Sequence, residues 1–569
     1  MTQYSVHGTV TDAKTGQGCA GLRIEVWDKD LFWDDALGSA TTDESGAFAL
    51  SFGAIAAQDL FFDRQPDLYF KVFYQQQLIH STENSVLWNA KAPDVHVHIE
   101  LPQTPGVHPD PSNHHSNNSK DTMAIHGKMP LRNLHVPCSP FADEDRKFGR
   151  LFPYLPPFDA SEEWLTAVAA LMDDETVDDA KGDSQTIPAG FTFLGQFIDH
   201  DITFDPTSSL ERQNDPNATR NFRTPLLELD SVYGSGPEAS PYLYDQENKG
   251  KLLVGKDNID LPRNSQNVAL IGDPRNDENR IVSQMQLAFI KFHNAVIDRL
   301  TSEGYPEGER FEEAQRLVRW HYQWIVLHEY LPLTVGKKTV KDILENGRKV
   351  YSWSVEPFIP VEFSVAGFRL GHSQVRNSYR IQEFLVNKLF ELSVFNKRGV
   401  NTDEVVDWQF FFNLNPHTRP QASRKLDEKL ANILKDLPVP ILGAGDQRRS
   451  LAFRNLLRSQ SFSLPSGQAV ARLLGARVLS NQELGLGNIS VAGPHEAPLW
   501  YYILKEADLC TQGETLGPVG GRIVGEVLVG LLQGDYKSFV TIDPNWKPFL
   551  GKHPGSFTMA DLLKAAGVA

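Results

Sequence analysis

Apolar and polar residues alternate in short runs over the first hundred positions. A period of two is typical of strands that bury one face. Turn-forming clusters rich in glycine and polar residues, such as Thr15–Gly18 and Asp43–Gly46, separate the runs. We therefore predict an antiparallel β-sandwich over residues 1–103. The runs are Ser5–Val10, Leu22–Trp27, Ala47–Phe52, Leu68–Phe73 and Val95–Ile99.

The next stretch, residues 104–125, contains very few residues that a core could bury. It is rich in Pro, Ser, Asn and His, which is the composition of a flexible linker. Its His114 and His115, with His96 and His98 upstream, could in principle hold a metal ion. We favour a simpler interpretation, a solvated strand face followed by a polar linker.

Helical spacing of apolar residues replaces the alternation from residue 126 to residue 569. Ser161 stands in front of an amphipathic run as an N-cap, and Gln284–Leu300 and Phe311–Leu327 each place apolar residues on one side of a helix. No sequence repeat is present. The predicted fold is multidomain: a small N-terminal all-β sandwich followed by a large, mainly α-helical domain.

Charge and composition exclude several classes of protein. The net charge of -17 repels nucleic-acid phosphates and anionic membranes. Three cysteines are too few for a disulfide framework. The N-terminus lacks the pattern of a secretory signal, and no run of 18 apolar residues occurs. We expect a soluble protein without a transmembrane segment, cytoplasmic by default. Secretion by a route that needs no N-terminal signal stays open.

The segment Gly195–Phe204 holds the densest group of chemically useful side chains. Residues i and i+4 of a helix share a face, so Gln196 and His200 can point into one cavity while Asp199 and Asp201 point elsewhere. Taken alone, this segment is better explained as an acidic helix end whose histidine pairs locally.

The same segment resembles the distal helix of the animal-type haem peroxidases, within the peroxidase–cyclooxygenase superfamily. The resemblance recurs in order at four further places between residues 130 and 475. One of them, Ile271–Asn279, resembles the distal arginine segment. The resemblance implies that His200 moves the peroxide protons, that Arg275 stabilises the charge on the breaking O–O bond, and that Gln196 lines the same pocket.

The proximal side carries the second part of the resemblance. Val361–His372 resembles the segment of the axial iron ligand, which implies that role for His372. Asn455 matches the asparagine that accepts the N–H of the proximal imidazole and so fixes its tautomer. Arg369 and Arg458 match positions that pair with the haem propionates.

The resemblance also implies that the haem is covalently attached through two carboxylates. Asp199 and Glu278 match the residues that form ester bonds with haem b in this family. Asn279 stands where some members have the methionine of a third, sulfonium bond. We therefore expect two ester bonds and no sulfonium bond.

The fourth match, Arg223–Ser235, resembles the calcium loop of the family. Calcium takes six to eight oxygen ligands, which alternate residues of an extended loop can supply. The family more often has aspartate and serine where this chain has Glu228 and Asp230. The alternative interpretation of the segment is an acidic strand that leads into a Tyr-Gly turn. The implied ligands are Asp201, Thr224, the Leu226 carbonyl, Glu228 and Asp230.

Three functions remain open at this stage. The favoured one is a peroxidase that reduces hydrogen peroxide and oxidises halides, thiocyanate or small organic donors. A fatty-acid dioxygenase of the same fold would need a tyrosine three residues before the proximal histidine, where this chain has Arg369. An adhesion or binding protein that uses the haem domain as a scaffold would have lost catalytic residues, which are all present here.

Two parts of the chain stay outside this chemistry. The N-terminal sandwich resembles transthyretin-like or carboxypeptidase regulatory-like modules, whose partner the sequence does not name. His293, His321 and His328 have no ligand partner at short spacing, and we interpret them as structural.

Overall fold

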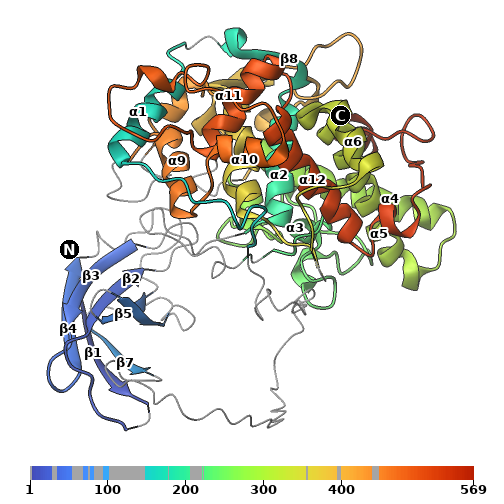
Figure 1. Cartoon of the computed structure of the whole chain (residues 1–569). Coiled ribbons are helices and arrows are strands. Elements are labelled where there is room, and N and C mark those ends of the chain that lie inside the picture. The colour runs from blue at the N-terminus through green and yellow to red at the C-terminus, as the bar shows by residue number, and fades with distance from the viewer. Residues whose placement is uncertain are drawn as a thin grey trace, which may run out of the picture. The chain divides into compact units, whose positions relative to one another are not determined.

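The computed structural model describes residues 3–13, 15–28, 35–53, 68–74, 77–82, 94–101, 148–176, 179–204, 221, 223–353, 356–393, 399–438 and 448–569. The chain divides into two compact units, Met1–Lys128 with Pro438–Gln447, and Met129–Leu437 with Arg448–Ala569 (Figure 1). The predicted linker lies outside the described residues.

The N-terminal unit contains two β-sheets. One has the strand order β4-β1-β7 and the other β3-β2-β5-β6. The five runs of alternating residues all form strands, whereas β3 and β6 were not predicted. The strands are β1 (Gln3–Asp12), β2 (Arg23–Asp28), β3 (Asp35–Thr41), β4 (Ala47–Gly53), β5 (Leu68–Tyr74), β6 (Gln77–Ser81) and β7 (Asp94–Leu101).

The prediction of a purely antiparallel sandwich is wrong at one edge, because β1 pairs with β7 in parallel. Parallel neighbours need a long connection, and here the intervening strands of both sheets provide it. Val6 and Val10 of β1 are fully buried, as are Ile24 of β2 and Val72 of β5. Between the two valines, a side chain on Gly8 would meet the Phe48 ring at 2.4 Å, so this position requires glycine.

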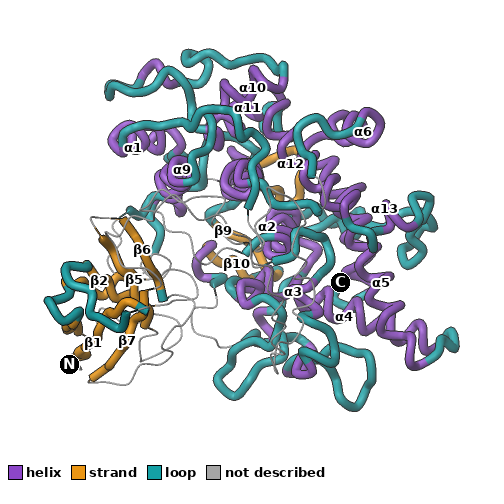
Figure 2. The backbone as a smooth tube through the Cα atoms, turned by 60° about the horizontal axis from the view of Figure 1, so that its bottom comes forward, coloured by secondary structure: helices purple, strands orange, loops and turns teal. Residues whose placement is uncertain are grey.

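The second unit is mainly helical, as predicted (Figure 2). Ser161 caps its first helix by accepting a hydrogen bond from the Trp164 amide at 3.2 Å. The longer helices are α1 (Glu162–Met172), α2 (Gly190–Ile202), α4 (Arg280–Ser302), α5 (Glu307–Ile325), α6 (Lys337–Asn346), α9 (Leu451–Ser461), α10 (Gly467–Leu474), α11 (Leu499–Thr511), α12 (Pro518–Gly534) and α14 (Met559–Ala565).

Short elements connect these helices and carry several residues of interest. Two small two-stranded sheets also occur, which the sequence analysis did not predict. The short helices are α3 (Asp230–Tyr233), η5 (Pro274–Asp277), η9 (Gly367–Leu370), α7 (Gly371–Gln374) and α13 (Phe539–Ile542). The strands are β8 (Asp183–Pro188), β9 (Ser378–Gln382), β10 (Leu385–Lys388) and β11 (Ala422–Arg424).

Helix α5 leads into α6 through two wider turns, Val326–Tyr330 and Pro332–Gly336. Proline has no amide hydrogen to donate, so Pro332 interrupts the regular hydrogen-bond ladder at this point. In the parts of the chain that the structure describes, no helix combines the length and apolar character that crossing a bilayer would require.

Candidate active site

Helix α2 supplies the first group of site residues. Its apolar side packs against α4, with the rings of Phe197 and Phe289 stacked 4.6 Å apart. The helix ends where the Thr203 amide donates to the Asp199 carbonyl. This packing holds Gln196 and His200 on a rigid element.

His200 is a buried, neutral histidine. Its side chain is 5% exposed, and its Nδ1 lies 2.7 Å from Oδ1 of Asn276. Burial and the nearby charge of Arg275 lower the pKa of His200 to about 3. A neutral imidazole at working pH has a lone pair free to accept a proton.

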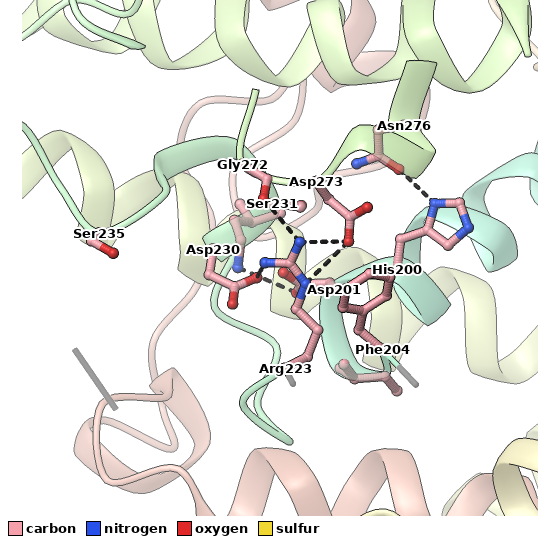
Figure 3. Close-up of polar contacts among 12 residues, drawn as sticks. His200, Asp201, Phe204, Arg223, Asp230, Ser231, Ser235, Gly272, Asp273 and Asn276 are labelled. Atoms are coloured by element: carbon pink, nitrogen blue, oxygen red, sulfur yellow. Dashed lines mark hydrogen bonds and ion pairs between the residues drawn. The ribbon is translucent and has the colours of Figure 1, made fainter. Parts of the chain in front are cut away.

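Arg275 is fixed beside His200 by several acceptors. It lies in η5, where its Nε donates to Asp273 and its Nη2 donates to the carbonyls of His200 and Thr203 at 3.1 and 2.6 Å. Asp273 is fully buried and also accepts from Arg223 at 3.0 Å (Figure 3). Burial alone would raise the pKa of Asp273, but the two guanidiniums hold it well below its usual value. The arginine therefore faces the site in a pre-set orientation.

His372 lies in α7, directly after η9, and contacts α9. Its Nδ1 is 2.7 Å from Nδ2 of Asn455, while Arg369 donates from Nη1 to Oδ1 of the same asparagine at 2.9 Å. Burial lowers the pKa of His372 to about 3. The pair of residues matches the sequence-based expectation, but the direction of the hydrogen bond does not. Asn455 donates here, because Arg369 occupies the carbonyl oxygen that the imidazole N–H was expected to reach.

Two carboxylates lie within electrostatic reach of Arg275, and one of them also reaches the proximal side. Burial raises the pKa of Asp199, against the opposing charges of Arg275 and then Arg369. Burial also raises the pKa of Glu278, again with Arg275 opposing it. Asp199 therefore lies within electrostatic reach of the distal and the proximal arginine.

Three of these residues combine an accessible side chain with dense surroundings. The Glu278 side chain is exposed, yet the surrounding protein is dense enough that burial raises its pKa. Asp199 and His372 show the same combination, with half-buried side chains and pKa values shifted by burial. A side chain that borders a space inside the domain would be partly exposed and would still have a pKa shifted by burial. A flat cofactor such as haem requires a space of this kind.

The remaining predicted haem-side residues are less closely tied to this group. Gln196 accepts a hydrogen bond from Nδ2 of Asn279 at 3.3 Å, which keeps it on the side of His200. The guanidinium of Arg458 lies over the Phe462 ring at 5.1 Å. Its half-buried side chain comes from α9, the helix that also carries Asn455.

The predicted calcium loop has a strained backbone. Leu229 adopts a left-handed conformation with φ 62° while fully buried, an unfavourable state for a leucine. Its amide donates to Oδ2 of Asp201 at 3.2 Å. The loop thus directs Glu228 and Asp230, on either side of Leu229, toward the end of α2.

The carboxylates of this loop are mutually destabilised. Oδ1 of Asp201 is buried and makes no hydrogen bond of standard geometry among the described residues, although the Tyr322 hydroxyl lies near enough to interact with Asp201. Burial and then Asp230 raise the pKa of Asp201 strongly. Burial and then Asp230 raise the pKa of Glu228 to about 7. Arg223 lies 3.2 Å from Asp230 and offsets part of this charge. Within the described ranges, no group of three or more His, Cys, Asp or Glu side chains has the geometry to hold a metal ion.

Four residues of the site were not found from the sequence: Asp273, Asn276, Gln286 and Arg223. Asp273 precedes Arg275 by two positions, a spacing typical of capping aspartates, and could have been noticed. Asn276 and Gln286 bond to each other, but their other partners, His200 and Ser231, lie 76 and 55 residues away, so no local pattern reveals them.

The other histidines are held by local contacts. The ring nitrogens of His293 lie 3.1 Å from the Tyr233 hydroxyl and 2.7 Å from the Gly250 carbonyl. His321 donates from Nδ1 to the Leu317 carbonyl, and its ring packs edge-on against Phe557. These contacts agree with the structural interpretation.

Comparison with known proteins places the chain in a family. Residues 207–562 match the family described as animal haem peroxidase. Heme peroxidase 2 of Caenorhabditis elegans is 25% identical over 422 residues, 60% of this chain and 58% of that protein. Human eosinophil peroxidase is 24% identical over 422 residues, 58% of this chain and 57% of that protein. The chain spans about half the length of the curated relatives it matches.

Solved structures share the fold. Peroxidase A from Dictyostelium discoideum has a TM-score of 0.52 at 16% identity, covering 74% of this chain and 93% of that chain. A fatty acid alpha-dioxygenase from Arabidopsis thaliana also has a TM-score of 0.52, at 15% identity, covering 75% of this chain and 76% of that chain. The fold alone therefore does not separate the two activities. The family match and the peroxidase relatives confirm the resemblance seen in the sequence: the chain belongs to the animal haem peroxidase family.

Proposed function

We propose that this protein is a haem-dependent peroxidase that reduces hydrogen peroxide and oxidises halides, thiocyanate or small organic donors. One observation carries the proposal: a buried neutral histidine, His200, stands beside Arg275, whose orientation is fixed by Asp273 and two backbone carbonyls. This pair combines a proton acceptor with a fixed positive charge, which is what cleavage of a peroxide bond requires.

The residues around the space inside the domain fit a haem. His372 would hold the iron, and Arg369 and Arg458 would pair with the two propionates, as guanidiniums do best. Bound haem supplies an iron that exchanges electrons with the peroxide and the donor. Asp199 and Glu278 border the same space, and we propose that they form ester bonds with haem methyl groups during turnover with peroxide.

The distal side chains perform the acid–base chemistry. Nε2 of His200 takes the first proton of hydrogen peroxide and returns it to the leaving oxygen. The Arg275 guanidinium stabilises the negative charge that develops on that oxygen, and it needs no reorganisation because its other hydrogen bonds are already made. Gln196 lies on the same face of α2 and lines the pocket in which the peroxide binds.

We propose that a calcium ion binds between Asp201 and the Arg223–Ser235 loop. The buried Oδ1 of Asp201 and the raised pKa values of Glu228 and Asp230 indicate negative charge that a divalent cation would neutralise. Thr224 and the Leu226 carbonyl would complete the ligand set. Because the described residues form no ready-made cage, the proposal requires the loop side chains to close around the ion.

The alternative is a fatty-acid dioxygenase, which the likeness to the plant enzyme keeps in view. Arg369 at the position of the required tyrosine counts against it. The experiment is an absorption spectrum of the purified full-length protein, then parallel assays of peroxide-dependent iodide or phenol oxidation and of oxygen uptake with linoleate. We expect a haem spectrum, donor oxidation and no uptake; oxygen uptake without donor oxidation would favour the dioxygenase.

A further inference from the structure

A chain of three buried hydrogen bonds runs from His200 to the protein backbone. Nδ1 of His200 lies 2.7 Å from Oδ1 of Asn276. Nδ2 of Asn276 donates to Oε1 of Gln286 at 2.8 Å, and Nε2 of Gln286 donates to the Ser231 carbonyl at 3.0 Å. Asn276, Gln286 and Ser231 are fully buried. Solvent therefore does not compete for any of these groups.

The direction of the chain is fixed at its backbone end. A carbonyl oxygen can only accept, so Gln286 must present its nitrogen to Ser231 and its oxygen to Asn276. Asn276 must then present its nitrogen to Gln286, which leaves its oxygen facing the imidazole. That oxygen can only accept, so Nδ1 of His200 carries the hydrogen. In a neutral imidazole the other nitrogen, Nε2, then has the free lone pair.

The Ser231 carbonyl, at which this series of hydrogen bonds ends, is itself held in place. The Ser231 carbonyl also accepts from the Gly272 amide at 2.9 Å, and Ser231 follows Asp230 in the short helix α3. Figure 3 shows Asn276 reaching the imidazole from one element while Arg223 and Asp273 occupy the space beside it. Rotating either amide by 180° would set oxygen against oxygen and nitrogen against nitrogen inside the core, which is costly.

We propose that Asn276 and Gln286 are positioning residues that hold His200 in its Nδ1–H form, so that Nε2 is the atom that receives the peroxide proton. The role of Nε2 as proton acceptor rests on the proposed peroxidase function, whereas the assignment of the tautomer rests on the hydrogen bonds alone.

The first test measures the tautomer directly. Full-length protein with 15N-labelled histidine is studied by NMR with and without haem, and the His200 signals are assigned with His200→Gln. We expect a protonated Nδ1 and an unprotonated Nε2. Asn276→Leu and Gln286→Leu should shift the signals toward the Nε2–H form or a mixture of both.

Two further variants make this test specific. Gln284→Leu is the matched control: Gln284 is a buried amide on the same helix α4, and it donates to the Ile259 carbonyl at 2.7 Å, outside the chain. It should leave the His200 signals unchanged. Asn276→Asp keeps an oxygen opposite Nδ1, although its second oxygen then faces Oε1 of Gln286. It should therefore retain the Nδ1–H form even if Asn276→Leu folds poorly.

The second readout is the bimolecular rate of reaction with hydrogen peroxide in the haem-loaded protein. Asn276→Leu should slow it about 10- to 100-fold, by analogy with the loss caused by removing the hydrogen-bonded partner of a metal-binding histidine. Asn276→Asp should recover most of that loss. An Nε2–H form in the wild type, or a tautomer unaffected by Asn276→Leu, would overturn the proposal. A wild type that keeps the Nδ1–H form but fails to react with peroxide would instead refute the peroxidase function.

Discussion

The two histidines of the site are held in opposite ways. On the distal side, the Asn276 oxygen accepts from His200, and Gln286 and the Ser231 backbone fix that direction. On the proximal side, the Asn455 nitrogen faces His372, because Arg369 occupies the asparagine oxygen. Both histidines are neutral and have pKa values lowered by burial to about 3.

The difference shows which of the two hydrogen-bond arrangements is anchored on the protein backbone. The distal chain ends on a backbone carbonyl and leaves Nε2 of His200 ready to accept a proton. The proximal asparagine is instead held by an arginine whose expected partner is a haem propionate. We expect Arg369 to leave Asn455 when it pairs with that propionate, which would free the asparagine oxygen for the His372 N–H.

The largest effect is expected on the proximal side. His372→Ala removes the proposed axial ligand, so the purified variant should contain almost no haem. Haem content per chain, measured by extraction and absorption, checks this. The exposed His417 offers a control, and His417→Ala should keep the wild-type content. A His372→Ala protein with the full wild-type spectrum would mean that another residue binds the iron.

The two carboxylates near Arg275, Asp199 and Glu278, provide the next test. After repeated exposure to hydrogen peroxide, digestion and mass spectrometry should find haem attached to the peptides that contain Asp199 and Glu278. Asp199→Asn and Glu278→Gln should each lose one attachment, and the double variant should release all its haem into acidified acetone. Fully extractable haem in the treated wild type would rule out the ester bonds.

The calcium loop joins the distal side through Asp201, the neighbour of His200. Removing calcium or introducing Asp201→Ala leaves the remaining loop carboxylates repelling one another. We expect a melting temperature lower by a few degrees, since about 1 kcal/mol corresponds to roughly 1 °C in a unit of more than 400 residues. Peroxide turnover should fall with it. The exposed Asp298 provides the control variant Asp298→Asn. An unchanged melting temperature in verified metal-free protein would contradict the calcium assignment.

The smallest expected effect is the contribution of His321, a histidine outside the site, to the loss of stability at low pH. Burial lowers the pKa of His321 to about 4 from 6.5, so the unfolded chain binds a proton first as the pH falls. Stability is therefore lost between pH 6.5 and pH 4, by about 2 kcal/mol at pH 5 from this residue. His321→Phe should reduce the drop in melting temperature between pH 7.5 and pH 5 without changing peroxide turnover. An identical drop would show that His321 does not contribute.

Much of this architecture could be predicted because local patterns carry it. Alternation marked five strands, Ser161 marked a helix start, and the segments around His200, Arg275 and His372 carried the family resemblance. The parallel pairing of β7 and the roles of Asn276 and Gln286 could not be predicted, because they depend on partners distant in sequence. The direction of the Asn455 hydrogen bond depends on a neighbouring arginine, which sequence spacing does not reveal.

The most direct test of the account is the reaction of the haem-loaded protein with hydrogen peroxide, followed by stopped-flow absorption. Wild type, His200→Ala and Arg275→Ala are compared at equal haem content. We predict a fast reaction in the wild type and a loss of about 100-fold or more in each variant. The two losses should not add fully in the double variant, because both residues act on the same bond cleavage. An unimpaired reaction in His200→Ala would contradict the account.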